Sequence, residues 1–460
     1  MKKTVSRRKF IGAALSVSAG AAALTMPGRA SAIDAAFARN FKPSEKCFMD
    51  QYYDGAMKIV RGIRDTQIET IAKAMEKAYE LKQKGGNIYS HVVYGHYAMF
   101  GGSRDIPGQP WVLPQCGITP AKAEFDAMKK GDFLITDRVD EDTKKVRERG
   151  VYVTGVTNNY FQFSRTPANF LRSDRVTLTI EEISDLLIDS QVPPDNGLVH
   201  APQLPQVACC PSSGISQYAV YWPCTAALAA LIGTKGKGSA ADAARKYLDI
   251  LIERFEMVGS DRPKVDWIAE KWADLVLGGR ARMLLYGHPQ QVEPYIGNRN
   301  VFVNDSNICS SSAMMADQYE AKANDLRKDD IVLVCAFTSD NPLEIEAARF
   351  ARSKGSYTVA FCPYATEGES SGLRLFKEVD DSLNTFADER AGVVAVPGFP
   401  EKVCPVSTMT GDLVLWLLTA QWADHMASRG EMPYFWKGYH ENGGKEFDDL
   451  AEAIYKKRGY

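Results

Sequence analysis

Internal repetition constrains the fold of this chain more than any other feature, because four segments recur in the same order. The paired segments are 68–96 with 267–288, 129–136 with 327–334, 147–157 with 352–362, and 209–222 with 403–416. Both members of the first pair end in Tyr-Gly-His, at His96 and His288. The offset between copies changes from 192 residues at these histidines to 205 residues at Gly150 and Gly355, as loop insertions would cause. The sequence therefore predicts two copies of one domain.

Each copy alternates between helical periodicity and short apolar runs. Strands that alternate with helices form a parallel sheet with helices on both faces. The predicted fold class is α/β, with two tandem doubly wound parallel-sheet domains of three layers, similar to flavodoxin and Rossmann folds. We expect domain 1 at 55–235 and domain 2 at 240–430, joined by a Gly-rich linker at 233–239. An N-terminal helical arm at 33–54 and a polar C-terminal tail at 431–460 complete the expected layout.

The first 32 residues have the composition of a secretory signal peptide. A basic start precedes a weakly apolar run from Ile11 to Met26, and Ala30-Ser31-Ala32 is typical of a cleavage site. Arg7 and Arg8 stand before the apolar run, as in a twin-arginine signal. The run is shorter than the ~20 residues that span a bilayer as a helix. We therefore expect export to the periplasm or beyond, with no stable membrane insertion after cleavage.

The mature chain is acidic. Six of the 55 Lys and Arg residues and none of the 57 Asp and Glu residues lie in the first 32, which leaves a net charge of −8. A nucleic-acid partner is therefore not expected. The nine cysteines form no Cys-x-x-Cys pair, and no zinc spacing or glycine-rich nucleotide motif occurs. We expect neither a metal nor a cofactor, and we identify no second long apolar run after the signal.

At the four repeated segments the chain resembles the sugar isomerase (SIS) domain family. The resemblance covers about 55–232 and 243–430, and it is strongest at 329–362, which follows the family's order of strand, hydroxyl-bearing loop, helix and strand. It implies a five-stranded parallel-sheet domain that binds phosphosugars.

The resemblance also implies that two loops of the second copy bind the ligand. The matching positions are Thr338, Ser339, Asp340 and Asn341 in the first loop and Ser407, Thr408, Thr410 and Gly411 in the second. Hydroxyls and free N–H groups at a helix start suit an anion or a sugar hydroxyl. Asp340 replaces a glycine of the family and would repel a phosphate, which leaves room for a neutral sugar. Helix capping by Asn341 is an alternative explanation for part of this pattern.

The first copy departs further from the family. Its first loop, 136–142, carries one hydroxyl and four carboxylates, so we do not expect it to bind an anion. Its second loop keeps Ser212 and Ser213 as candidate ligand-binding residues. We expect one site, in the second copy, and leave open whether the first copy binds a ligand.

Aldose–ketose isomerisation needs a base that moves a proton between neighbouring carbons and an acid that polarises the carbonyl or opens the ring. The candidates are His96 and His288, after strand-like runs, and Glu344, in the first turn of a helix. Glu344 is equally interpreted as a capping residue, and Asp412 as a charge that suits a helix start. His425 lies too far along its helix to reach the same loops.

The leading hypothesis is an exported SIS-like protein that binds a carbohydrate derivative and isomerises a sugar or phosphosugar. The alternative is a binding or regulatory protein without catalytic activity. A flavodoxin-like cofactor protein is disfavoured because the glycine motifs are missing. The two domains could pair within one chain or across a homodimer, and the sequence leaves both arrangements open.

Overall fold

The computed structural model describes residues 46–92, 122–205, 207–279, 281–287, 302–303, 307–310, 326–364, 372–388, 391–435, 437–438 and 440–458. The expected signal peptide and most of the expected arm lie outside the described residues, as do His96 and His288.

The first half of the chain forms a parallel sheet in the order β1-β2-β3-β4. Its elements are α3 (Phe48–Thr66), α4 (Ile68–Gln83), β1 (Ile88–His91), α5 (Lys122–Ala127), β2 (Phe133–Thr136), α6 (Glu141–Glu148), β3 (Tyr152–Val156), α7 (Ile180–Ile183), β4 (Leu186–Ile188), β5 (Gly197–Val199), β6 (Cys209–Pro211) and α8 (Ser213–Gly233). Strands β5 and β6 form a separate antiparallel pair.

The second half forms a five-stranded parallel sheet in the order β12-β11-β10-β7-β9. Its elements are α9 (Ala240–Ser260), α10 (Arg262–Gly279), β7 (Met283–Gly287), β8 (Phe302–Val303), β9 (Asn307–Ser310), β10 (Ile331–Cys335), α13 (Pro342–Ser353), β11 (Tyr357–Cys362), β12 (Asp381–Asn384), α14 (Ser407–Ser428), β13 (Tyr434–Phe435) and α15 (Gly444–Arg458). The predicted α/β class with parallel sheets is confirmed.

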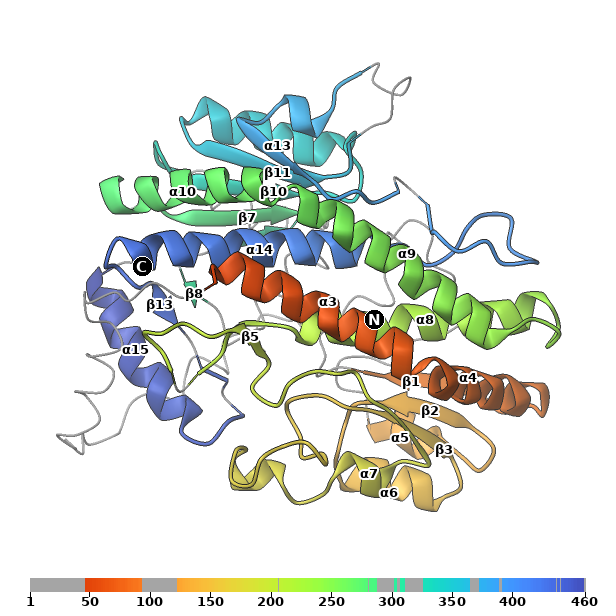
Figure 1. The fold of residues 1–460 in the computed structure, drawn as a ribbon. Helices are drawn as coiled ribbons and strands as arrows, with labels where there is room; N and C mark the ends of the chain where they lie inside the picture. The colour runs from red at the N-terminus through yellow and green to blue at the C-terminus, as the bar shows by residue number, and fades with distance from the viewer. Residues whose placement is uncertain are drawn as a thin grey trace, which may run out of the picture.

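The two sheets lie on opposite sides of a central layer of helices (Figure 1). Alternate residues of a strand face opposite sides of its sheet. In β10, Leu333 packs into the central core and Val334 into a smaller cluster with Ile345 of α13. In β2, Ile135 faces the central core and Leu134 an outer cluster with Val146 of α6. Both sheets are therefore covered on both faces, which explains why their strands are apolar throughout.

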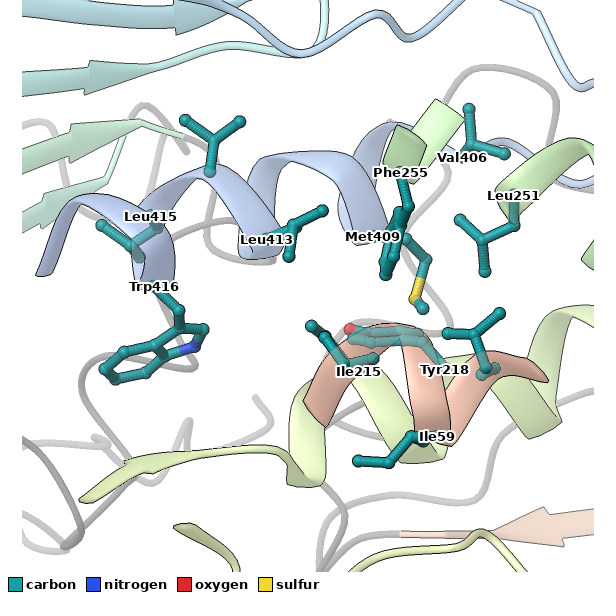
Figure 2. Packing of buried hydrophobic residues seen from close by; sticks show 14 of the residues in the cluster. Ile59, Ile215, Tyr218, Leu251, Phe255, Val406, Met409, Leu413, Leu415 and Trp416 are labelled. Atoms are coloured by element: carbon teal, nitrogen blue, oxygen red, sulfur yellow. The ribbon is translucent and has the colours of Figure 1, made fainter. Parts of the chain in front are cut away.

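The first helix of each half packs mainly on the last helix of the other half. Helix α3 lies along α14, and α9 lies along α8. Figure 2 shows side chains of α3, α8, α9 and α14 meeting in one apolar cluster that includes Ile59, Tyr218, Phe255 and Met409. Each fully buried side chain of this size contributes about 1.5–3 kcal/mol. Because one core serves both halves, neither half buries its apolar surface alone.

Two tyrosines make equivalent hydrogen bonds in the two halves. Tyr52 of α3 donates to Pro211 O at 3.1 Å, and Tyr247 of α9 donates to Pro405 O at 3.0 Å. The residues before these prolines, Cys210 and Cys404, have φ angles of 59° and 62°. Such left-handed backbone is uncommon outside glycine. Helix α3 thus occupies a place equivalent to that of α9, and it runs without a break across the boundary expected between residues 54 and 55.

Helix α8 is, within the described residues, long and apolar enough by composition to cross a membrane. The sequence expectation of no second long apolar run was therefore wrong. The helix is 94% buried in the protein over its most apolar window, so its composition reflects a place at the centre of the core.

Candidate functional site

The first loop of the second sheet follows β10 and leads into α13. Gly287, the last residue of β7, pairs with Cys335, the last residue of β10, so both strands end at the same sheet edge. Thr338 is half-buried there, and Ser339 is fully buried. The Asn341 side chain accepts a hydrogen bond from Leu343 N at 3.1 Å and caps α13. The loop thus lies where the resemblance implies, but Asn341 is engaged in capping.

Arg374 adds a positive charge to this loop. Its Nη1 donates to Ser339 Oγ at 3.1 Å and lies 3.9 Å from Asp340 Oδ2, and Leu375 N donates to Ser339 O at 2.6 Å. Arg374 is only 8% exposed. Its charge offsets that of Asp340, so the repulsion expected from Asp340 alone does not describe this loop. Arg374 was not among the predicted site residues, because no local sequence pattern connects it to a loop more than thirty residues earlier.

Glu344 is 2% exposed and lies near the end of β10. Burial is the main cause of the raised pKa of the Cys335 thiol, and the Glu344 carboxylate adds to it. The side chain of Glu344 is therefore close to the strand end. The cap of α13 is the Asn341 side chain, and no capping box through Glu344 is formed there. A buried carboxylate at a strand end can still support the loop or act on a ligand.

The hydroxyls of the second loop are largely committed to the protein. Thr408 Oγ1 accepts a hydrogen bond from Trp222 Nε1 at 3.3 Å, and Thr410 Oγ1 donates to Val406 O at 3.2 Å. Ser407 is 4% exposed at the start of α14. The structure thus directs Thr408 toward α8 of the other half, a contact that the sequence could not indicate.

Ser212 and Ser213 in the first half are likewise engaged. Both backbone N–H groups donate to Asn196 Oδ1, at 3.0 and 2.8 Å, and Asn196 Nδ2 donates to Ser213 Oγ at 3.2 Å. Asn196 has a φ of 60°, a conformation that asparagine tolerates better than most residues. It therefore caps α8 from a distant loop, which is a structural role for two predicted ligand-binding serines.

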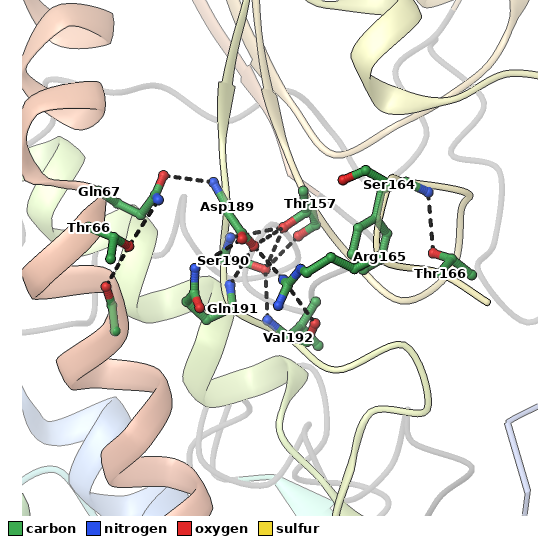
Figure 3. Close-up of polar contacts among 12 residues, drawn as sticks. Thr66, Gln67, Thr157, Ser164, Arg165, Thr166, Asp189, Ser190, Gln191 and Val192 are labelled. Carbon is green, nitrogen blue, oxygen red and sulfur yellow. Dashed lines mark hydrogen bonds and ion pairs between the residues drawn. The ribbon is translucent and has the colours of Figure 1, made fainter.

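The carboxyl edge of the first sheet is held by internal polar contacts (Figure 3). Asp189 Oδ1 accepts from Thr157 Oγ1 at 3.1 Å and from Arg165 Nη2 at 2.6 Å, and Asp189 N donates to Gln67 Oε1 at 3.0 Å. In the first loop, Asp140 caps α6 by accepting from Thr143 N.

A histidine from the C-terminal segment reaches the first sheet. His440 Nε2 lies 3.0 Å from Asn159 Nδ2, and its ring lies 4.4 Å from that of Tyr160. Arg172 N donates to His440 O at 3.0 Å, which holds the segment against the first half. The residues after 430 therefore include a docked segment. His425, by contrast, bonds to Asp266 at 2.8 Å between α14 and α10, away from both loops.

Asp412 is a fully buried carboxyl in the second turn of α14. It is 1% exposed, and burial raises its pKa to about 7, although a side-chain hydrogen bond from Trp416 lowers it in part. A Cβ added to Gly214 would lie 2.6 Å from Asp412 Oδ2, so the carboxyl sits beside the start of α8. A helix start favours an anion by at most ~2 kcal/mol, whereas burial of an ion costs several kcal/mol. Desolvation therefore dominates.

The cavity of about 370 Å³ between α5 and α6 is lined by Phe125, Asp126, Asp142, Lys145, Glu148 and Arg149. None of the candidate site residues lines it. Within the described ranges, no group of three or more His, Cys, Asp or Glu side chains is arranged to hold a metal ion.

No protein-family model matches the sequence. The chain is 30% identical over 140 residues to a UPF0309 protein of Geobacillus kaustophilus, which covers 29% of this chain and 55% of the relative. It is 22% identical over 139 residues to a UPF0309 protein of Halalkalibacterium halodurans, covering 29% of this chain and 56% of the relative. The chain thus spans about half the length of the curated relatives it matches.

Two solved structures are distantly similar. A candidate phosphosugar isomerase of Silicibacter pomeroyi is 12% identical, with a TM-score of 0.45 over 84% of this chain and 100% of that chain. The C-terminal domain of glucosamine-fructose-6-phosphate aminotransferase of Francisella tularensis is 10% identical, with a TM-score of 0.43 over 81% of this chain and 96% of that chain. Similarity at this level assigns no activity to the present protein.

Proposed function

We propose that this chain is a tandem SIS-like protein that binds an anionic sugar derivative, such as a sugar phosphate, at the first loop of its second half. The observation that carries the proposal is the contact of Arg374 with Ser339 at the start of α13. A guanidinium, a hydroxyl and a helix N-terminus are groups that bind phosphate or carboxylate. The matched hydrogen bonds of Tyr52 and Tyr247 support the tandem arrangement.

The site differs from the neutral-sugar site that Asp340 alone suggested. Arg374 is buried and lies near Asp340, so the pair has no net charge before a ligand arrives. An anionic ligand can then exchange with Asp340 as the partner of the guanidinium. A neutral sugar would leave the Arg374–Asp340 contact in place and gain only ordinary hydrogen bonds, each contributing about 1 kcal/mol.

Arg374→Gln is expected to weaken binding of a sugar phosphate by about 10- to 100-fold, because a charge-assisted hydrogen bond contributes about 1.5–3 kcal/mol. Titration calorimetry with a panel of sugar phosphates and the matching neutral sugars measures this. Arg349→Gln is the control, since Arg349 is an exposed arginine of α13 that pairs with Glu378. Equal affinities for the Arg374→Gln variant and the wild type would refute the anion site.

Glu344→Gln is expected to separate catalysis from binding. If Glu344 is the base that moves the proton, the variant loses about 10²–10⁴-fold of the rate. The readout is exchange of deuterium from solvent into a sugar that binds, with affinity measured in parallel. Glu346→Gln, an exposed glutamate on the same helix, is the matched control.

Two outcomes would decide between the catalytic and non-catalytic proposals. A wild-type protein that binds a sugar phosphate without exchange or product would exclude isomerisation and leave the binding or regulatory alternative. Exchange that persists in Glu344→Gln would assign the base to another residue.

A further inference from the structure

Asp412 lies where the two halves of the protein meet. It belongs to α14 of the second half and contacts the start of α8 in the first half, as its distance to a Cβ built on Gly214 shows. It also acts on Tyr52 of α3, whose pKa is raised mainly by burial and further by this carboxylate. Within the described part of the chain, neither oxygen of Asp412 has a hydrogen bond of ordinary geometry, and the Trp416 indole is the donor near enough to lower its pKa, by less than burial raises it.

Among the residues that the structure describes, no cation offsets the charge of Asp412. The titratable group that faces it from α3 is the Tyr52 hydroxyl, which itself faces the Cys210 thiol ahead of α8 and donates to Pro211 O. On α14 itself the neighbour is Trp416, and the first turn of α8 presents Gly214. No lysine, arginine or histidine of α9, α10 or the adjacent strands contributes to its pKa among the described residues.

The equivalent position in the first half shows that this carboxyl is not needed to build the junction. When 209–222 is aligned with 403–416, Asp412 corresponds to Tyr218 and Thr408 to Gly214. In one direction across the junction, Trp222 donates to the Thr408 hydroxyl. In the other direction, Gly214 occupies the position equivalent to Thr408 and offers no hydroxyl, and the Asp412 carboxyl lies beside Gly214. Tyr218, its counterpart, is an almost fully buried residue with an uncharged side chain.

We propose that Asp412 is a proton-operated switch in the junction between the halves: the neutral carboxyl is accommodated, and its ionisation loosens the packing of α14 on α8 and α3. The neutral form fits an apolar contact, whereas the anion has, among the described residues, only the Trp416 indole as a donor and no cation beside it. The switch acts at the helix that begins with Ser407, so it couples pH to the second loop of the candidate site. It stands independently of which sugar, if any, binds there.

The direction of the pH effect follows from linkage. Burial raises the pKa of Asp412 from 3.8 to about 7 in the folded protein. The unfolded chain therefore loses this proton at lower pH than the folded chain, so stability falls as pH rises from about 4 to about 7 and levels off above that. Between pH 6 and pH 8 the unfolding constant should rise by about tenfold through this group alone.

The experiment follows unfolding of the wild-type chain in denaturant at pH values from 5 to 9, beside Asp412→Asn and Glu401→Gln. Glu401 is an exposed carboxylate in the segment before α14 and serves as the control. The wild type and Glu401→Gln are expected to lose stability across this interval. Between pH 6 and pH 8, the unfolding constant of Asp412→Asn is expected to rise about tenfold less than that of the wild type. Hydrogen exchange of peptides from 407–418 and 213–222 should increase with pH, after correction for the intrinsic rate, in the wild type and in Glu401→Gln but not in Asp412→Asn.

Parallel pH profiles for the wild type and Asp412→Asn would overturn the proposal. If Asp412→Asn does not fold, infrared titration of the buried carboxyl in a protein that keeps Asp412 tests the proposal. It is recorded in an Asp195→Asn, Asp424→Asn background, because burial also raises the pKa of those two carboxyls. A buried neutral carboxyl that is present at pH 6 and lost by pH 8 supports the switch, and its absence at pH 6 overturns it.

Discussion

Trp222→Ala is expected to destabilise the whole protein by about 3–5 kcal/mol, the usual cost of removing a large buried aromatic side chain. Trp222 has no exposed surface, its ring packs 4.9 Å from that of Tyr221, and its indole donates to Thr408 across the junction of the halves. The loss is measured as the free energy of unfolding in denaturant. Because one apolar cluster joins both halves, both sheets should lose protection from hydrogen exchange together.

Two further variants make this expectation specific. Trp222→Phe keeps most of the packing and removes the hydrogen bond, so the expected cost of that bond is about 1 kcal/mol on top of a modest packing loss. Trp267→Ala removes a tryptophan that is 50% exposed and should cost less than about 1 kcal/mol. If Trp222→Ala unfolded the first sheet while β10 stayed protected, the halves would be independent units and the shared core would have no energetic role.

Gly233→Ala is expected to cost about 3 kcal/mol, at the upper end of the range for overpacking. A Cβ at this position would lie 1.9 Å from Pro397 O, and backbone at that point cannot rotate away as a side chain can. The contact joins the end of α8 to the loop before α14, and Gly398 of the same loop, with a φ of 86°, also lies against Gly233. The glycine that the sequence marks as a linker is thus a close contact between halves.

Gly278→Ala is the matched control. Gly278 lies inside α10 with nothing within 4 Å of an added Cβ, so alanine should stabilise the helix by about 0.5–1 kcal/mol. Denaturant midpoints for the two variants should move in opposite directions. A Gly233→Ala protein as stable as the wild type would mean that the loop carrying Pro397 does not rest on the end of α8.

The strands were the part of the fold most accessible from sequence. The apolar runs at 129–136 and 327–334 contain or begin β2 and β10, and the runs at 147–157 and 352–362 contain β3 and β11. Local composition is sufficient here, because a parallel strand buried on both faces must be apolar along its length. No such signal indicated that α3 packs on α14 and α9 on α8 of the opposite half. Each helix has an apolar face, but the sequence does not say which helix covers that face.

The candidate site was only partly accessible. The loop with Thr338, Ser339 and Asn341 was placed at the end of a strand, and it lies there. Arg374 at the same loop and His440 at the first sheet were missed, because each arrives from a distant segment. Thr408 and Ser213 were assigned to ligand binding from the resemblance and from their place at a helix start, and in the structure their hydroxyls bond to Trp222 and Asn196.

The sequence by itself determined the α/β class, the parallel strands and the loops that hold hydroxyls at helix starts, because these depend on the order of neighbouring residues. Only the tertiary structure decided which half each helix covers, which hydroxyls the protein itself uses, and that Asp412 is buried between α14 and α8. The reason is physical. A hydrogen bond or a desolvated charge depends on what lies across the interface, and residues close in space there are up to about two hundred positions apart in the chain.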